Sequence, residues 1–560
     1  HETRELPLVT LVGLPVRVGH RLFNAAVALQ KGKILAVVPK TYLSDAETRW
    51  FTSSYEAMEE SIKICGQIVP FGTDILLKYN KLSFGIEIGN DLWATVPPSS
   101  LQALAEAQLI FNLSTSNDEA GKHNYFKKLI EQQSARCIAG YVYASSGFGE
   151  SSTDLLFSGS SLIAENGTIL AENKRFSLEE QLLVNDIDIE RLISDRQKNS
   201  CFTQNASSLN FRKIPFELPV YQSFSLDRKI NSQPFIPEKR ETNERYEEIL
   251  NIQVNALATR LYNTGIKSVV VGVSGGLDST LALLVCAKTF DKIGISRQNI
   301  HGITMPGFGT TSRTYNNAAE LIRGLGISFR EIDIKAACIQ HFKDINQSEN
   351  CFDITYENAQ ARERMQILMD IANQSSSLVV GTGDLSELAL GWATYNGDHI
   401  SMYAINAGVP KTLIHHLVRW VAENSADSNT HHTLMDIIST PVSPELLPAA
   451  DNGEISQRTE DVVGPYELHD FFLYYMIRFG FRPAKIFFLA QTAFSEKYNN
   501  ETIKKWLKTF LHRFFTQQFK RSCLPDAPKI GSVSLSPRGG WQMPSDASAS
   551  MWLADLECEI

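Results

Sequence analysis

The chain has 560 residues, of which 43% are hydrophobic and 21% are charged, and its formal net charge at pH 7 is −9. This composition is typical of a globular protein that buries a sizeable core, and the length suggests two or three domains. The negative charge argues against a general nucleic-acid-binding protein, and no apolar run approaches the roughly 18 residues of a membrane span.

The eight cysteines are widely scattered, and no two of them form a C-x-x-C pair. This spacing argues against a disulfide framework or a zinc site and favours a reducing, cytoplasmic environment. The N-terminus lacks the layout of a signal peptide and begins, without Met, almost directly in a strand-like run. We therefore expect an N-terminal piece to precede His1.

Short apolar runs separated by Gly, Asn, Ser and Pro predict a β-rich first part, ending near residue 185. Its predicted strands cover residues 8–16, 25–29, 34–38, 84–88, 109–113 and 138–144. Residues 186–240 differ, because a polar stretch is followed by four prolines at 215, 219, 234 and 237. This composition predicts an extended connector between two domains.

From residue 241 onwards, predicted helices and strands alternate. The helices cover residues 241–262, 279–290, 316–325 and 361–373, and the strands cover 268–273, 300–304, 328–334 and 378–381. Alternation at this spacing predicts a parallel, doubly wound sheet, with one domain over 241–560.

The most informative motif is the run V-G-V-S-G-G-L-D-S-T at residues 271–280, between a β-branched strand and an apolar helix. Two adjacent glycines let backbone N–H groups gather around an anion, and the helix N-terminus adds its positive dipole end. The Lys of a Walker loop is absent, and Asp278 instead suits a Mg²⁺ ion that bridges phosphate oxygens. A glycine-rich turn without a ligand is the alternative, but the complete string favours nucleotide binding.

This string resembles the pyrophosphate loop of N-type ATP pyrophosphatases, which cleave ATP between its α and β phosphates to adenylylate a carboxylate. Further motifs follow in order and together resemble the synthetase domain of the glutamine-dependent NAD⁺ synthetases. They begin at Thr304, Glu357, Gly381, Asn406, Gly464, Gln518 and Ser536. The resemblance implies that ATP activates the carboxylate of nicotinic acid adenine dinucleotide as an acyl-adenylate, and that ammonia then gives NAD⁺ and AMP.

The same resemblance implies roles for individual residues. Those that would hold ATP are Ser274, Gly275, Gly276, Asp278, Ser279, Thr280 and Thr382. Those that would bind nicotinic acid adenine dinucleotide are Asn358, Glu387, Lys411 and Lys520, and the Mg²⁺ ligands would be Asp278 and Glu387. The structural alternatives are a helix N-cap for Thr382, a helix-surface amide for Asn358 and solvated ammonium groups for the two lysines.

Residues 1–185 resemble the nitrilase-like amidase domain that supplies ammonia from glutamine in this family, which implies an α-β-β-α sandwich. Such amidases use a Glu base, a Lys that stabilises the oxyanion and a Cys nucleophile. Lys40 fits the Lys motif, whereas the segment after Leu43 is a few residues shorter than the family pattern. Ser116 and Lys122 stand where glutamine is bound, with Lys122 where an Arg is usual.

The family motif around the nucleophile reads E-I-C-E-D-x-W, but residues 87–93 read E-I-G-N-D-L-W. Gly89 thus occupies the nucleophile position without a side chain, and the Glu base would lie upstream of His1. We therefore expect no glutaminase turnover and an ammonia-dependent synthetase. The alternative is that Gly89 is an engineered or sequencing change in an otherwise competent enzyme.

Two other functions stay open at this point. One is a different adenylylating amidotransferase, similar to GMP synthetase, and the other is a non-catalytic paralogue. The resemblance implies ATP, Mg²⁺, glutamine or ammonia and nicotinic acid adenine dinucleotide as ligands, and a homo-oligomer as the assembly. It implies neither a nucleic-acid partner nor a membrane.

Overall fold

The computed structural model describes residues 4–150, 153–205, 209–219, 221, 224–237, 242–425, 427–440, 446–447 and 459–557. The chain forms two compact units, His1–Lys229 and Ile230–Ile560, each with its own sheet and core. The expected domain boundary at residues 240–241 lies outside the described residues, as do residues 151–152 of an amidase-like segment.

Two sheets pack face to face in the first unit. The smaller, antiparallel sheet contains β1 (Thr10–Val18), β2 (Arg21–Gln30) and β3 (Lys33–Pro39). The larger sheet has the order β11-β10-β9-β8-β7-β6-β12. Its strands are β6 (Ile75–Tyr79), β7 (Leu82–Ile88), β8 (Leu109–Ser114), β9 (Gly140–Ser145), β10 (Ser161–Glu165), β11 (Thr168–Glu172) and β12 (Arg212–Pro215). Ala26 and Ala28 of β2 pack against Ile86 and Phe84 of β7, which joins the two sheets in one core.

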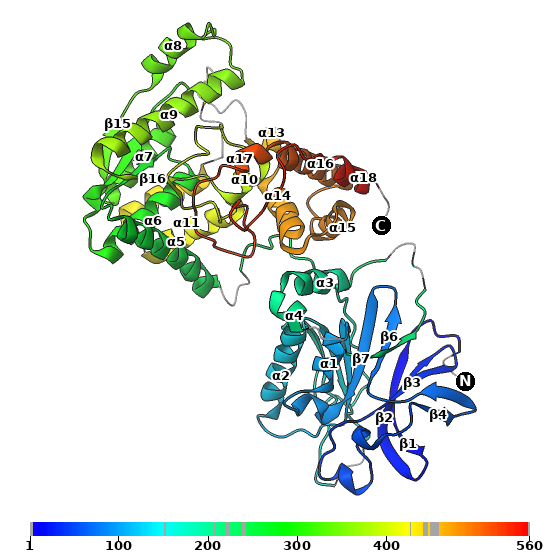
Figure 1. Cartoon of the computed structure of the whole chain (residues 1–560). Coiled ribbons are helices and arrows are strands. Elements are labelled where there is room, and N and C mark those ends of the chain that lie inside the picture. The colour runs from blue at the N-terminus through cyan, green and yellow to red at the C-terminus, as the bar shows by residue number, and fades with distance from the viewer. Residues whose placement is uncertain are drawn as a thin grey trace. The chain divides into compact units, whose positions relative to one another are not determined.

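Outer layers cover both sheets (Figure 1). Helices α1 (Pro98–Leu104) and α2 (Lys122–Cys137) pack on the larger sheet, for example through Ile130 of α2. A hairpin of β4 (Ser61–Ile64) and β5 (Gln67–Pro70) packs Ile62 and Val69 on the smaller sheet, and no described α-helix contributes to that core. The expected sandwich is thus confirmed, with a hairpin on one side where a helical layer was expected.

Part of the predicted connector belongs to the first unit. Helices α3 (Ile189–Lys198) and α4 (Ser200–Asn205) are followed by β12, which pairs in parallel with β6. Arg196 is buried and donates hydrogen bonds to the carbonyl oxygens of Ala107, Cys137 and Ile138. These bonds attach α3 to the layer of helices and strands beneath it, so the segment is not extended throughout.

The second unit confirms the predicted doubly wound sheet. Its strands are all parallel, in the order β15-β14-β13-β16-β17. They are β13 (Val269–Gly272), β14 (Ile300–Thr304), β15 (Ser328–Glu331), β16 (Leu378–Gly381) and β17 (Tyr403–Ala404). Val269 and Val271 face one core and Val270 faces the other, because side chains alternate along a strand.

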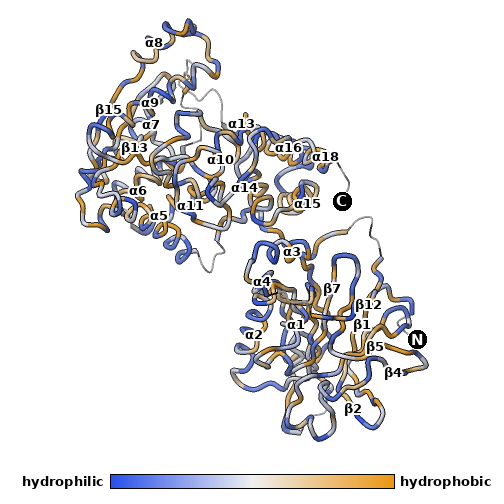
Figure 2. The backbone as a smooth tube through the Cα atoms, in the orientation of Figure 1, coloured by the Kyte–Doolittle hydropathy of each residue, from blue (hydrophilic) through white to orange (hydrophobic). Residues whose placement is uncertain are grey.

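Helices cover both faces of this sheet (Figure 1). One core includes α5 (Thr242–Thr264), α6 (Leu277–Ile293), α7 (Ser312–Gly324), α11 (Lys411–Ser425) and α12 (Ser428–Ser439). The other core includes α8 (Lys335–Asp344) and α9 (Ile354–Ser375). Hydrophobic and hydrophilic segments alternate along α5 in Figure 2, as expected for a helix with one buried face.

A further set of α-helices belongs to the second unit. It comprises α10 (Leu385–Leu390), α13 (Thr459–Val463), α14 (Tyr466–Leu473), α15 (Pro483–Ala493), α16 (Asn500–Thr516), α17 (Gln518–Arg521) and α18 (Ser550–Asp555). Among the described helices, none combines the length and the hydropathy that a bilayer-crossing segment requires.

Candidate functional sites

The main candidate site lies at the carboxyl ends of the strands of the second unit. The chain proceeds from β13 to β14 and β15 on one side and then returns to β16 on the other side of β13, so the strand order reverses beside β13. Ligands of open α/β sheets bind at such a reversal. The phosphate-loop segment follows β13, the segment with Thr382 and Glu387 follows β16, and Lys411 lies beyond β17.

The loop after β13 depends on Gly275. This residue has φ +87°, and a β-carbon there would lie 2.1 Å from the carbonyl oxygen of Thr314 on α7. Only glycine permits both the left-handed backbone and this close approach. The loop is held by hydrogen bonds among its own residues, since the Ser274 hydroxyl lies 3.2 Å from the Ser279 hydroxyl and accepts from the Gly276 N–H.

Three carboxylates meet around one ammonium group in this site. The Lys411 Nζ lies 2.6 Å from Asp278 Oδ2, 2.7 Å from Asp384 Oδ2 and 2.9 Å from Glu387 Oε1. Asp384 is fully buried and caps α10, because its Oδ1 accepts from the Glu387 N–H. The structure therefore brings together Asp278, Glu387 and Lys411 as expected, and it adds Asp384.

The charges of this cluster shift one another's pKa. Burial raises the pKa of Asp384 well above its usual range, and the neighbouring carboxylates of Glu387 and Asp278 add to this shift. Burial also raises the pKa of Glu387 to about 7, although Lys411 opposes it. Burial disfavours the charged form of Lys411, but the three carboxylates outweigh it and raise the pKa of the ammonium well above its ordinary value.

The donor set of the cluster fits a divalent cation. One oxygen from each of Asp278, Asp384 and Glu387 lies within 4.8 Å of the others, and oxygen ligands are those that Mg²⁺ prefers. Asp278 Oδ1 and the buried Thr280 hydroxyl have no hydrogen-bond partner among the described residues. The Asp278 oxygen is therefore free to bind a cation, and the Thr280 hydroxyl is free to donate a hydrogen bond to an oxyanion.

Asn406 joins the two strand ends that carry the carboxylates. Its side-chain amide donates to the carbonyl oxygens of Asp278, at 2.8 Å, and Thr382, at 3.2 Å, and its Oδ1 accepts from Gln253. Asn406 is fully buried. Sequence reasoning assigned no role to it or to Asp384, although both lie inside the family motifs. The spacing of Asp384 and Glu387, three residues apart at a helix start, is itself a capping signal.

The remaining predicted residues lie around this cluster with other partners. Asn358 on α9 accepts a hydrogen bond from the Thr394 hydroxyl at 2.8 Å. Lys520 on α17 donates to the carbonyl oxygens of Gly391 and Ala393, at 2.7 and 2.6 Å. The turn of residues 391–398 thus connects both side chains to a small pocket, whose lining includes Glu387, Asp398 and His399.

Three cationic side chains bind the end of α10 and the turn that follows it. Arg521 donates to the carbonyl oxygens of Leu388 and Ala389, Arg513 donates to that of Leu390, and Lys520 continues the series as described above. Cations stabilise a helix C-terminus, where carbonyl oxygens lack partners within the helix. The helix that carries Glu387 is therefore fixed at both ends.

The second candidate site lies in the first unit, at the end of β7. The Lys40 ammonium is nearly buried and contacts both carboxylate oxygens of Glu47, at 2.8 and 2.7 Å. A β-carbon on Gly89 would lie 3.6 Å from Lys40 Nζ and 3.6 Å from the Ser114 hydroxyl oxygen. Lys40 and the vacant nucleophile position therefore face each other, as expected. Glu47, seven residues after Lys40, is a partner that sequence reasoning missed.

Buried polar groups fix this site. Asp91 accepts hydrogen bonds from the N–H groups of Thr41, Tyr42 and Ile88, which connects the Lys40 loop to the end of β7. Burial raises the pKa of Asp91 to about 7, with a contribution from the charge of Glu87, against these backbone donors. Sequence reasoning gave Asp91 no role.

The predicted glutamine-binding residues lie on or near the loop before α2. The Lys122 ammonium donates to the carbonyl oxygen and to the Oδ1 of Asn117, at 2.9 and 3.1 Å. The Ser116 hydroxyl contacts Tyr143. Burial raises the pKa of Tyr143, and hydrogen bonds from neighbouring hydroxyls, including that of Ser116, partly oppose this shift. Ser116 is half-buried.

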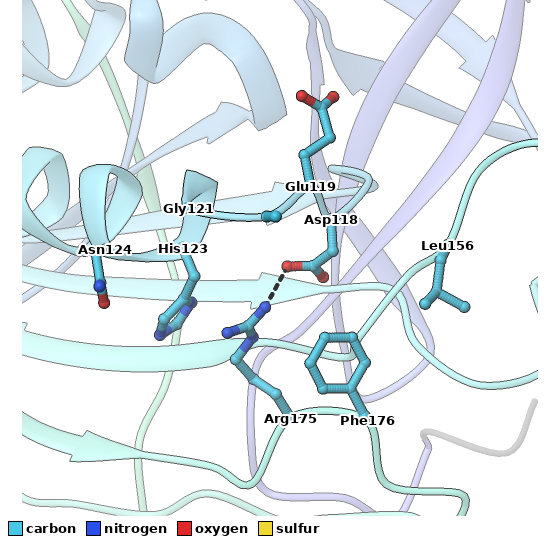
Figure 3. Close-up of a pocket in the computed structure, with 9 residues that line it drawn as sticks. Asp118, Glu119, Gly121, His123, Asn124, Leu156, Arg175 and Phe176 are labelled. Atoms are coloured by element: carbon cyan, nitrogen blue, oxygen red, sulfur yellow. Dashed lines mark hydrogen bonds and ion pairs between the residues drawn. The ribbon is translucent and has the colours of Figure 1, made fainter.

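The same loop borders a pocket of about 380 Å³. Asp118 and Arg175 form an ion pair of 2.6 Å on its wall, and Phe176 and Leu156 give it an apolar side (Figure 3). None of the predicted catalytic or glutamine-binding residues lines this pocket. It is therefore a separate cavity beside the loop that precedes Lys122.

Comparisons with known proteins show what this chain is similar to. Residues 249–513 match the family model described as NAD synthase. The chain is 41% identical over 589 aligned residues to the glutamine-dependent NAD(+) synthetase of Mycobacterium leprae, with 99% of this chain and 86% of that protein covered. It is 28% identical to the glutamine-dependent NAD(+) synthetase of Aquifex aeolicus, covering 97% and 86%. A crystal structure of a glutamine-dependent NAD(+) synthetase from Cytophaga hutchinsonii aligns over 98% of this chain and 87% of that one, with a TM-score of 0.48 and 20% identity.

Proposed function

The chain belongs to the family of glutamine-dependent NAD(+) synthetases, and from this premise we propose that its second unit amidates nicotinic acid adenine dinucleotide to NAD⁺. ATP converts the nicotinate carboxylate into an acyl-adenylate with release of pyrophosphate, and ammonia then displaces AMP. A free carboxylate is a poor acyl donor, because its leaving group would be an oxide, and adenylylation supplies a better one. The enzyme is accordingly a carbon–nitrogen ligase.

One observation supports this proposal most directly. Asp278, Glu387 and Lys411 meet where the strand order of the sheet reverses. Ser274, Gly275, Gly276, Ser279 and Thr280 would hold the phosphates of ATP, with Thr382 at the neighbouring strand end. Asp278 and Glu387 would hold Mg²⁺, and the bound ion would neutralise the charge of the phosphates. Asn358 and Lys520 would support the dinucleotide through the turn of residues 391–398.

The first unit favours ammonia over glutamine as the nitrogen donor. Lys40 and Glu47 are arranged around Gly89, but covalent attack on glutamine requires a nucleophilic side chain at that position. Ser116 and Lys122 would then bind glutamine without hydrolysing it. We further propose that the protein is cytoplasmic and that it forms a homo-oligomer. Light scattering on the purified protein tests the oligomeric state.

A pyrophosphate-release assay tests the proposed function. The protein is incubated with ATP, Mg²⁺ and nicotinic acid adenine dinucleotide, with either ammonium or glutamine. We expect pyrophosphate and NAD⁺ with ammonium and no NAD⁺ with glutamine alone. Pyrophosphate release with xanthosine monophosphate instead would indicate a relative of GMP synthetase. No release with either of these substrates would indicate a non-catalytic paralogue.

A further inference from the structure

Lys411 lies where a divalent cation would bind. Its Nζ contacts one oxygen each of Asp278, Asp384 and Glu387 at 2.6 to 2.9 Å, and the same three carboxylates each offer an oxygen within 4.8 Å of the others, as a metal ion requires. The side chain is only 7% exposed. An ammonium group and a divalent cation compete for such a position, because both need the same three carboxylates and their charges repel.

The backbone of Lys411 is held in place, whereas the rotatable bonds of its side chain let the ammonium group take other positions. The Lys411 N–H donates to the Ser386 hydroxyl at 2.8 Å, which fixes the start of α11. Asp384 is held independently of Lys411, since its Oδ1 caps α10 through the Glu387 N–H. The flexible stem of lysine can therefore carry its charge away from the carboxylates while they stay in position.

The phosphate loop adjoins this cluster directly, because Asp278 belongs to both. A triphosphate in the loop brings negative oxygens that an ammonium group can bind in place of carboxylates. Without the triphosphate, removing the ammonium from three carboxylates leaves it without a compensating partner. Nucleotide binding therefore lowers the free-energy cost of replacing the Lys411 ammonium by a metal ion.

We propose that Lys411 occupies the metal position of the nucleotide-free protein, so that a divalent cation enters this site only together with the triphosphate. Lys411 is then a positioning residue that neutralises the three carboxylates before the ion arrives, and its ammonium group moves to the phosphates afterwards. This inference rests on the proposed function and adds an order of ligand binding to it.

Equilibrium dialysis of the full chain against Mn²⁺ tests the inference without an activity measurement. The protein is dialysed with and without an ATP analogue that carries a methylene group between the α and β phosphates. For the wild type we expect protein-retained Mn²⁺ to require the analogue, with at least about a tenfold difference in apparent affinity. In K411M we expect the nucleotide-free protein to bind Mn²⁺ at least about tenfold more tightly than the wild type does.

Two further variants keep the test decisive. Lys292→Met removes an exposed lysine from α6, the helix of Asp278, and should behave as the wild type. The double variant K411M/D384N removes one charge of each sign. If K411M alone does not fold, Mn²⁺ binding by this double variant without nucleotide is measured instead. Tight Mn²⁺ binding by the wild type without nucleotide would overturn the inference and leave the proposed function standing. Absence of retained Mn²⁺ with the analogue would contradict both.

Discussion

The carbonyl oxygen of Thr314 lies 2.1 Å from the point where a β-carbon would stand on Gly275. This approach brings the start of α7 against the phosphate loop, and it leaves no space for any side chain. For Gly275→Ala we expect a loss of about 2–4 kcal/mol in the free energy of unfolding, because backbone atoms must shift and φ is +87°. Urea denaturation measures this loss, and nucleotide binding should fall with it.

Gly294→Ala is the matched control for that variant. Gly294 caps the C-terminal end of α6, the helix that follows the phosphate loop, with φ +70°, but nothing lies within 4 Å of its virtual β-carbon. Only backbone strain is then introduced, at about 1 kcal/mol. Equal losses for the two variants would show that the contact with Thr314 is unimportant.

Asp278→Asn should abolish most synthetase activity. The change removes a negative charge from a site built to bind a cation and phosphates, and we expect at least about a hundred-fold lower kcat. Asp291→Asn removes a carboxylate from the same helix, where it pairs with Arg297 at the surface, and should leave kcat near that of the wild type. Comparable kcat values for the two variants would exclude Asp278 from the site.

Gly89→Cys should create a reactive thiol. The space beside Lys40 and Ser114 admits a β-carbon, and a nearby ammonium favours the thiolate form. We expect iodoacetamide to label this residue at least about tenfold faster than Cys137, whose pKa burial raises to about 12. Peptide mass spectrometry quantifies both sites. The double variant G89C/K40M should lose the enhancement, and an enhancement that persists would rule out Lys40 as its cause.

Asp91 should make the first unit less stable as the pH rises. Its pKa is raised from 3.8 to about 7, so the folded state binds this proton more tightly than the unfolded state does. The stabilisation is complete below about pH 4 and is lost as the pH increases through about 7, with a total on the order of 4 kcal/mol. Hydrogen exchange of β7 amides at several pH values measures this trend. Asp91→Asn should flatten it, and a parallel profile in both proteins would contradict the assignment.

The sequence predicts the elements of the second unit well, because strong local patterns dominate there. The strand predicted at 268–273 is observed as Val269–Gly272, and the helix predicted at 279–290 as Leu277–Ile293. The helix predicted at 361–373 starts earlier, at Ile354, since Asp353 caps it through the N–H groups of Thr355 and Tyr356. An Asp at this position is a helix-start signal that the sequence itself contains.

Features that depend on long-range contacts escaped prediction. The Asn406 bonds to Asp278 and Thr382 join residues 128 and 24 positions apart, and no local pattern encodes them. The pairing of β12 with β6 likewise depends on tertiary contacts, such as the Arg212 ion pair with Asp74, and not on the proline-rich composition of its surroundings. For Lys520, the family resemblance implied contact with the dinucleotide. Its observed carbonyl partners, such as Gly391, are brought to it only by the tertiary fold.

The cations at the end of α10 differ from Lys411 in the kind of atom that they bind. Arg513, Lys520 and Arg521 contact main-chain oxygens, so their replacement by a neutral amide would strand no buried anion. Replacing Lys411 alone would strand three. Substitutions should therefore be tolerated unequally at the two ends of α10. At its C-terminal end, a neutral side chain that donates N–H groups leaves no charge unpaired. At its N-terminal end, Lys411 and the three carboxylates can only be replaced together.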